Sequence, residues 1–196
     1  MRLKGFIFDL DGTIVETDYD WSRIKNEIGT GGQPILNYIN QLSPVERQQK
    51  YQLLEQYEKK ATDQARLKKG IKSFLEFLRQ KKVKIALVTN NSWANTEIIL
   101  RKFNLSFDRV LTRESGLWKP SGLPIKSIID YFQLKSQECA VVGDSLFDVQ
   151  AAREAGVNHI FILTEEAGRF SGYPVKVFPS IPALQDFVRR EYFQPS

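Results

Sequence analysis

The sequence predicts an α/β protein built on a doubly wound parallel sheet, with a helical insertion after the first strand. Short apolar runs typical of buried strands alternate with segments whose apolar residues recur every three or four positions. This alternation is typical of a parallel sheet covered by helices on both faces. The segment 17–69 differs, because it contains only helical patterns. We therefore expect a core domain at 1–16 and 70–196 and a small helical domain at 17–69.

The first strand pattern is the apolar run 3–8, which ends at two aspartates. In the segment that follows, Ser43, Pro44 and Glu46 predict a helix start, because they suit the N-cap, the first helical position and a capping box. We expect this helix to continue to about residue 68 and to stop at Gly70. Apolar residues between 24 and 39 indicate one or two shorter helices, broken at the glycine-rich turn 29–32.

After residue 70 the two kinds of pattern alternate regularly. Strand patterns lie at 83–88, 110–111, 139–142 and 160–163, and helical patterns at 71–78, 93–103, 123–132, 149–155 and 181–192. Together with the run 3–8, these strands are expected to form one parallel sheet. In such a sheet the ligand site lies beyond the carboxyl ends of the strands.

The composition is typical of a globular protein, with 42% hydrophobic and 26% charged residues in a chain of 196. No apolar run reaches the roughly 20 residues that a membrane-spanning helix needs. The first residues lead straight into a strand pattern rather than a signal peptide. We expect a cytoplasmic monomer or homodimer with no membrane partner.

Cys139 and His159 are the only residues of their kinds, which excludes an intrachain disulfide and a Cys- or His-rich metal site. His159 precedes an apolar run and is interpreted as a strand-edge residue. Acid–base chemistry must therefore come mainly from carboxylates and lysines. The formal charge of +5 comes largely from scattered basic pairs, which we interpret as solvated helix faces rather than a nucleic-acid site. A mild positive field also favours anionic small substrates.

Polar side chains follow four of the strand patterns, at the point where each strand would end. They are Asp9 and Asp11, Thr89 and Asn90, Lys119 in the loop after the third strand, and Asp144 and Asp148. Each has a plain structural alternative, such as an acidic turn, a strand end, a surface lysine or a favourable acid at a helix N-terminus worth ~0.3–1 kcal/mol. Their recurrence after successive strands favours one shared site at the carboxyl edge of the sheet.

Three or four carboxylates with few other ligands suit Mg²⁺, a hard cation that prefers oxygen. A carboxylate can also attack a phosphoryl group to form an aspartyl-phosphate, while a second carboxyl group moves protons. Lys119 would offset negative charge, and Thr89 with the N–H groups after it lies just ahead of a helix, where phosphate oxygens bind well. These residues predict magnesium-dependent phosphoryl chemistry.

The chain resembles the haloacid dehalogenase-like (HAD) hydrolases over nearly its full length. The resemblance rests on four motifs, namely Asp9-Leu10-Asp11-Gly12-Thr13, Thr89 after Leu87-Val88, Lys119-Pro120, and Gly143-Asp144-Ser145-Leu146-Phe147-Asp148. It implies a Rossmann-like core in which Asp9 is the nucleophile and Asp11 the general acid/base. It also implies Mg²⁺ bound by the carboxylates of Asp9 and Asp144 and the carbonyl of Asp11, with Asp148 supporting the site. Phosphate would be held by Thr89, Asn90 and Lys119.

The insertion 17–69 resembles the small helical cap of phosphoglycolate phosphatase-like members. Because the cap supplies substrate contacts in this family, Tyr19, Trp21 and Arg23 are candidates to meet the leaving group, as is Lys25; solvated surface positions are the alternative. Asp11 argues against the dehalogenase branch, and Thr13 favours phosphatases over phosphomutases.

The first hypothesis is a Mg²⁺-dependent phosphatase acting on a small phosphorylated metabolite. A sugar phosphomutase of the same superfamily is the alternative within enzymes, and a non-catalytic HAD-like binding or regulatory protein is the alternative outside them. Asp11 and Lys119 count against the last, since binding alone requires neither. A dinucleotide-binding dehydrogenase and a P-loop protein are disfavoured because both glycine fingerprints are absent from the sequence.

Overall fold

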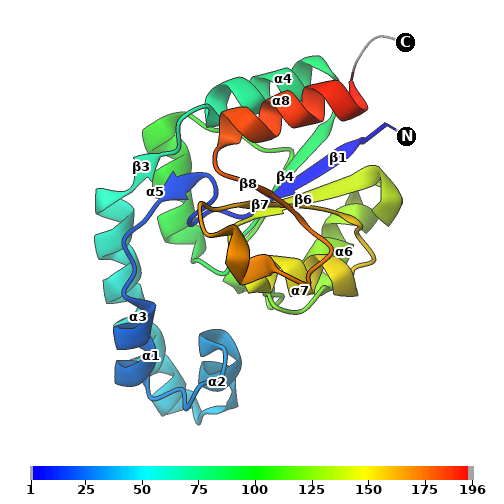
Figure 1. Ribbon diagram of the computed structural model, residues 1–196. Helices are drawn as coiled ribbons and strands as arrows, with labels where there is room; N and C mark the ends of the chain where they lie inside the picture. Colours follow the sequence, from blue (N-terminus) through cyan, green and yellow to red (C-terminus); the bar gives the residue numbers. More distant parts are fainter. Residues whose placement is uncertain (1, 194–196) are drawn as a thin grey trace.

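A computed structural model describes residues 2–193 of the chain. Its main sheet has six parallel strands in the order β5-β4-β1-β6-β7-β8 (Figure 1). The strands are β1 Gly5–Phe8, β4 Lys84–Val88, β5 Arg109–Leu111, β6 Cys139–Gly143, β7 His159–Leu163 and β8 Lys176–Phe178. The predicted parallel α/β fold is confirmed.

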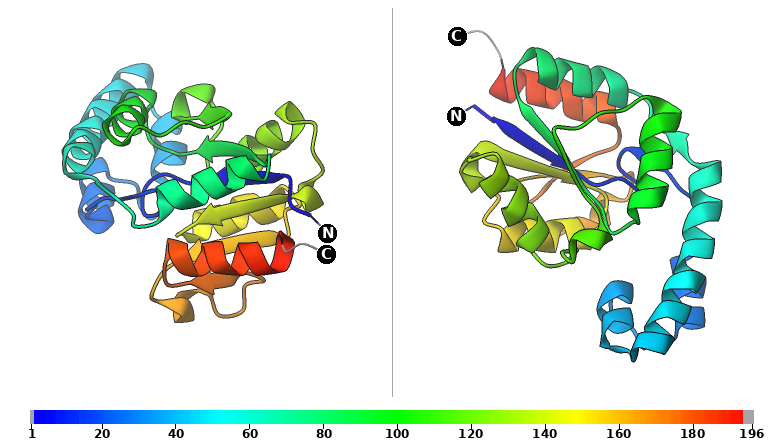
Figure 2. Two further views of the ribbon diagram at one scale, coloured as in Figure 1. Left: turned by 90° about the horizontal axis from the view of Figure 1, so that it is seen from above. Right: turned by 180° about the vertical axis from the view of Figure 1, so that it is seen from behind.

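Helices cover both faces of this sheet. Helices α4 (Ile71–Gln80), α5 (Trp93–Phe103) and α8 (Ile181–Tyr192) lie on one face, and α6 (Leu123–Tyr131) and α7 (Leu146–Glu154) lie on the other (Figures 1 and 2). The alternation within β1 explains the two layers: Phe6 and Phe8 pack into the first apolar cluster, and Ile7 packs into the second. Among residues 2–193, none of the helices combines the length and apolar character that crossing a bilayer requires.

The register of β1 with its neighbours brings three strand ends together. Phe8 lies opposite Leu87 of β4 on one side and Val142 of β6 on the other. Asp9 follows the last residue of β1, and Thr89 and Asp144 follow the last residues of β4 and β6, so all three emerge at the carboxyl edge with Asp9 on the central strand. Parallel topology thus assembles the predicted site from segments far apart in sequence.

The chain between β1 and α4 forms a helical lobe outside the sheet. It contains α1 (Trp21–Ile28), α2 (Ile35–Gln41) and α3 (Pro44–Gln64), drawn in blue to cyan in Figure 1. An apolar cluster of its own holds the lobe together, with Ile24, Ile28, Leu36, Ile39 and Leu54 buried at its centre. The capping box of Ser43 and Glu46 is present at the start of α3, as predicted.

The prediction for the end of α3 was wrong. The helix stops at Gln64, and residues Arg66–Leu67 form a strand, β3, that pairs antiparallel with β2 (Val15–Glu16). Gly70, predicted to stop α3, instead begins α4 as its N-cap with φ 88°. Two-residue strands are too short for an alternating pattern to reveal them, so backbone pairing with β2 decides the conformation here.

The number of strands in the main sheet was also predicted incorrectly, because β8 was missed. This strand of three residues pairs with β7 at one edge of the sheet. Helix α7 begins at Leu146 rather than residue 149, because Ser145 caps it with a side-chain hydrogen bond from the N–H of Asp148. The earlier start places Asp148 inside the first turn of α7.

Candidate active site

A cavity of about 470 Å³ lies between the carboxyl edge of the sheet and the helical lobe. Its sheet side is lined by, among others, Asp9, Asp11, Thr89, Asn90, Lys119 and Asp144. Its lobe side includes Tyr19, Trp21, Lys25, Ile35, Leu54 and Glu58. Polar groups therefore concentrate at the sheet, whereas apolar and aromatic side chains dominate the lobe wall.

Three carboxylates converge at the sheet side of this cavity. Asp9, Asp144 and Asp148 each offer one oxygen, and these oxygens all lie within 4.8 Å of one another. Asp9 directly follows β1, where its N–H donates to the carbonyl of Val142 at 2.9 Å. Burial, together with the nearby Asp148 carboxylate, raises the pKa of Asp144 to about 7. A cluster of hard oxygen donors whose charges repel one another fits a site for Mg²⁺.

Asp148 is the most firmly held of the three carboxylates. Its Oδ2 accepts hydrogen bonds from the hydroxyl of Ser145 at 2.6 Å and from the backbone N–H groups of Ser145 and Asp144 at 3.0 and 3.3 Å. Its side chain is 1% exposed. The start of α7 thus orients Asp148 rigidly and leaves its Oδ1 directed at Lys119.

Two glycines allow the acidic loops to approach each other closely. A Cβ atom on Gly12, which has φ 76°, would lie 2.1 Å from Oδ2 of Asp144. A Cβ atom on Gly143 would lie 2.3 Å from Cγ of Asp148. Any larger residue at either position would therefore displace a carboxylate of the cluster.

Lys119 bridges two members of the cluster. Its Nζ lies 2.7 Å from Oδ1 of Asp9 and 2.6 Å from Oδ1 of Asp148. Burial alone would lower the pKa of Lys119, but the carboxylates of Asp148 and Asp9 outweigh burial and raise it. The side chain of Asn90 fixes the lysine backbone, accepting from its N–H at 2.9 Å and donating to its carbonyl at 2.8 Å. Lys119 is therefore a charged, buried and preorganised cation.

Asp11 lies in the turn after β1, apart from the other three carboxylates. Its Oδ2 accepts a hydrogen bond from Nδ2 of Asn91 at 3.1 Å. Its Oδ1 is buried and has no hydrogen-bond partner among residues 2–193. Burial raises the pKa of Asp11, and the side chains of Asn91 and Thr17, together with the charge of Lys119, oppose this only in part. A carboxyl group with a raised pKa and one free oxygen is suited to exchanging a proton with a bound molecule.

Asn91 is a site residue that the sequence prediction missed. Its N–H donates to Oγ1 of Thr89 at 3.0 Å, and its side chain donates to Asp11 and, at 3.3 Å, to the hydroxyl of Tyr19. The only signal in the sequence was its place directly after Asn90 at a strand end. Arg113, which pairs with Glu58 of the lobe, was missed as well.

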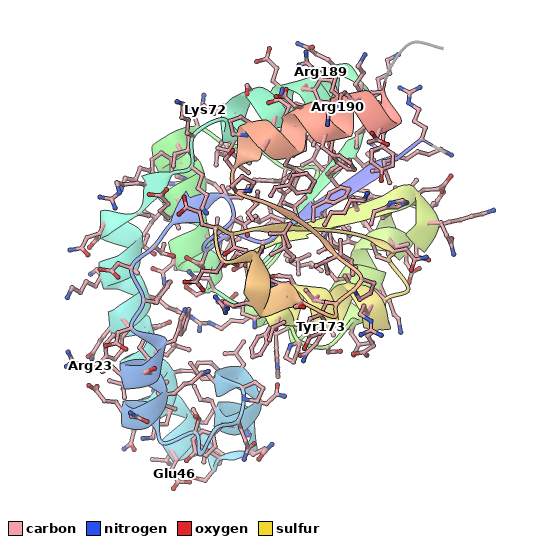
Figure 3. The ribbon with its side chains drawn as sticks, viewed as in Figure 1. Arg23, Glu46, Lys72, Tyr173, Arg189 and Arg190 are labelled. Carbon is pink, nitrogen blue, oxygen red and sulfur yellow. The ribbon has the colours of Figure 1, made fainter. Side chains whose placement is uncertain are left out.

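The three candidate substrate residues of the lobe are placed differently. Tyr19 and Trp21 both line the cavity and stack on each other, with ring centroids 4.4 Å apart and an interplanar angle of 24°. Lys25 also lines it. Arg23 does not: its side chain is 66% exposed, pairs with Glu27 at 2.8 Å and lies on the outer side of the lobe (Figure 3).

The comparisons with known proteins identify the family of the chain. The family model described as "Haloacid dehalogenase-like hydrolase" matches residues 18–162. A haloacid dehalogenase-like hydrolase domain-containing protein of Arabidopsis thaliana is 31% identical over 86% of this chain and 74% of its own length. A phosphoglycolate phosphatase of Nitrosospira multiformis is 30% identical over 82% of this chain and 83% of its own length.

A solved structure of a hydrolase from Pseudomonas syringae shares the fold. It has a TM-score of 0.78 at 18% sequence identity and covers 96% of this chain and 99% of its own. The match extends over the sheet and the helical lobe together, because nearly the whole of both chains is superposed. The chain belongs to the haloacid dehalogenase-like hydrolase family.

Proposed function

We propose that this protein is a Mg²⁺-dependent phosphatase that hydrolyses a small phosphorylated metabolite through an aspartyl-phosphate on Asp9. The observation that carries the proposal is the contact of Lys119 with both Asp9 and Asp148, at the point where Asp144 converges, in a cavity that Asp11 also lines. The similarity to a phosphoglycolate phosphatase supports the same class of substrate, a phosphoric monoester.

In the first step a carboxylate oxygen of Asp9 attacks phosphorus, and the bond from phosphorus to the leaving oxygen breaks. Asp11 gives its proton to that oxygen. Lys119, Thr89 and Asn90 line the same cavity, where they would offset and hold the negative charge of the phosphoryl group. Water then attacks the aspartyl-phosphate and returns a proton to Asp11, which releases inorganic phosphate and restores Asp9.

We propose that Asp9, Asp144 and Asp148 hold the metal, with the backbone carbonyl of Asp11 as a further oxygen donor. Bound Mg²⁺ supplies positive charge that lets a phosphate dianion approach a carboxylate. Burial raises the pKa of Asp9 well above its usual range, although the ammonium group of Lys119 opposes this. Positive charge at the cluster would favour the ionised form of Asp9 that attacks.

We propose that segment 17–69 is a cap on a core domain at 1–16 and 70–196. The separate apolar cluster of the lobe and the pairing of β2 with β3 at the two crossings support this division. Tyr19 and Trp21 would contact the leaving group, because they line the lobe side of the cavity. Arg23 is left out of this set because it lies outside the cavity lining.

The test is release of phosphate from p-nitrophenyl phosphate and from a panel of phosphorylated metabolites in the presence of Mg²⁺. We expect turnover that stops with EDTA and with the Asp9→Asn variant. Activity that survives Asp9→Asn would reject Asp9 as the nucleophile. Isomerised rather than hydrolysed sugar phosphate, stimulated by a sugar bisphosphate, would instead indicate a phosphomutase.

A further inference from the structure

A buried ion pair joins the helical lobe to the core. Glu58 belongs to α3, and Arg113 belongs to the short 3₁₀ helix η1 (Arg113–Ser115) that follows β5. Both oxygens of Glu58 accept hydrogen bonds from the Arg113 guanidinium, one of them at 3.0 Å, and both side chains are 5% exposed. Glu58 also lines the active-site cavity. The pair therefore fixes α3 to the core beside the reaction site.

Asn95 carries this contact towards the centre of the site. It lies on α5, is 6% exposed, and its Nδ2 is 3.4 Å from Oε2 of Glu58 and 3.4 Å from Oδ1 of Asn91. Arg113 reaches the same place through its backbone, because its N–H donates to the carbonyl of Asn91 at 3.2 Å. Asn91 is thus held by the side chain of Asn95, which also contacts Glu58, and by the backbone of Arg113, whose side chain pairs with Glu58.

Asn91 in turn orients the carboxyl group of Asp11 by a hydrogen bond to one of its oxygens. Its Oδ1 accepts from the N–H of Ser92 at 2.8 Å and from Asn95, so its Nδ2 is left to donate to Oδ2 of Asp11. The other oxygen of Asp11, Oδ1, then has no partner among the described residues. The four residues Glu58, Arg113, Asn95 and Asn91, named here the lobe–core network, thereby leave one particular oxygen of Asp11 available.

We propose that Glu58, Asn95 and Asn91 are positioning residues that orient Asp11 for proton transfer to the leaving group, with Arg113 anchoring Glu58. The proposal rests on the assignment of Asp11 as general acid under the proposed function. It adds that Asp11 is correctly oriented only when the lobe is docked on the core, because the same contacts hold the lobe and orient Asp11. A network without this role would only hold the lobe in place.

Two substrates of similar shape distinguish a network that orients Asp11 from one that only holds the lobe in place. Phenyl phosphate releases a strongly basic oxygen and needs a proton from the acid, whereas p-nitrophenyl phosphate releases a weakly basic one and needs it far less. The value of kcat/KM covers the steps up to expulsion of the leaving group. Asn95→Ala should lower kcat/KM about 10-fold or more for phenyl phosphate relative to p-nitrophenyl phosphate, since small misplacements of a catalytic group can cost up to about 10²-fold. An equal loss for both substrates would overturn the proposal.

A double variant keeps the test independent of folding. Removing one partner of a buried ion pair leaves an uncompensated charge, whereas replacing both by apolar residues is often tolerated. Glu58→Leu combined with Arg113→Met should therefore retain a cooperative thermal transition and still show the selective loss with phenyl phosphate. Unchanged selectivity in a folded double variant would reject the role of Glu58. Lys60→Met, an exposed change on the same helix, is the matched control and should leave both rates unchanged.

Asp11→Asn separates failure of this proposal from failure of the proposed function. If Asp11→Asn shows the selective loss and Asn95→Ala does not, Asp11 is the acid and the lobe–core network does not position it. If Asp11→Asn loses activity equally with both substrates, the assignment of the acid itself is wrong. Selective loss in both variants, with Asn95→Ala the milder, is the expected result.

Discussion

The Nζ atom of Lys119 lies 2.7 Å from Oδ1 of Asp9, the oxygen-bearing group proposed to attack phosphorus. A cation so close offsets charge on the nucleophile and on the approaching phosphate. Lys119→Met should therefore lower kcat about 10²–10³-fold, the usual effect of removing one preorganised donor. Lys126→Met, at an exposed position of α6, should leave kcat unchanged in the same phosphate-release assay. Full activity in Lys119→Met would remove this lysine from the mechanism.

Gly12 is expected to tolerate no side chain. Alanine there would face both the left-handed backbone, φ 76°, and Oδ2 of Asp144 at 2.1 Å. Gly31→Ala is the matched control, because Gly31 also has positive φ, 58°, but no described heavy atom lies within 4 Å of the position that its new methyl group would take. Urea unfolding should show a loss of about 1 kcal/mol for Gly31→Ala and about 2–3 kcal/mol for Gly12→Ala. Equal losses would mean that the loop moves away from Asp144 freely.

Trp21 should contribute to substrate binding more than to chemistry. Its ring stacks on Tyr19 in the lobe wall of the cavity. Trp21→Ala should raise KM for the preferred substrate about 2–10-fold with little change in kcat, in line with the energy of one aromatic contact. Trp93 is equally exposed, at 46%, but lies outside the cavity lining, so Trp93→Ala should leave KM unchanged. Identical KM values for the two variants would contradict a binding role for Trp21.

Glu58 should make stability depend on pH. Burial raises its pKa from 4.5 to about 7, although Arg113 opposes the shift. Between pH 4.5 and about 7 the folded state then binds more protons than the unfolded state. The contribution of Glu58 to the free energy of unfolding is therefore full below pH 4.5 and is lost as the pH rises through about 7. The free energy of unfolding of the wild type, relative to Glu58→Gln, should fall by on the order of 2–3 kcal/mol across this window. A relative rise would show that pairing with Arg113 outweighs burial.

Magnesium should stabilise the folded protein directly. A ligand that binds only the folded state, at a concentration 100 times its dissociation constant, adds about 2.7 kcal/mol to the free energy of unfolding. This corresponds to a rise of about 5–10 °C in Tm for a chain of this size. The shift should disappear in Asp144→Asn, which removes one of the clustered oxygens, and persist in Asp130→Asn, an exposed position on α6. Calorimetry with and without Mg²⁺ measures it. A persistent shift in Asp144→Asn would place the metal elsewhere.

The sheet and the motif positions could be predicted because they depend on local patterns. Buried strands such as β1, β4 and β6 appear as apolar runs, and parallel topology then requires their carboxyl ends to meet. The gathering of Asp9, Thr89 and Asp144 around one cavity follows from that rule. Strands of two or three residues, such as β3 and β8, carry no such pattern and depend on backbone pairing.

The lobe side of the site could be predicted only in part: Tyr19 and Trp21 line the cavity, whereas Arg23 does not. The rest depends on how the helices are rotated. Burial of Ile24 and Ile28 in the lobe cluster turns the opposite face of α1, with Arg23, towards solvent. Glu58 and Arg113 meet because α3 packs against the core beside α5, and 55 positions separate the two residues in the chain. Periodicity identifies a helix but does not reveal which distant residue its polar face will meet.

The pairing of β2 with β3 affects how the sequence of this protein can diverge in evolution. Val15 lies opposite Leu67 and Glu16 opposite Arg66, so the chain leaves the core and re-enters it at adjacent points. A segment with adjacent ends can be shortened, lengthened or exchanged while the strands on either side stay in register. Under the proposed role of the lobe in substrate contact, new substrate preferences would therefore arise by changes within segment 17–69 alone, while the carboxylates and Lys119 of the core stay the same.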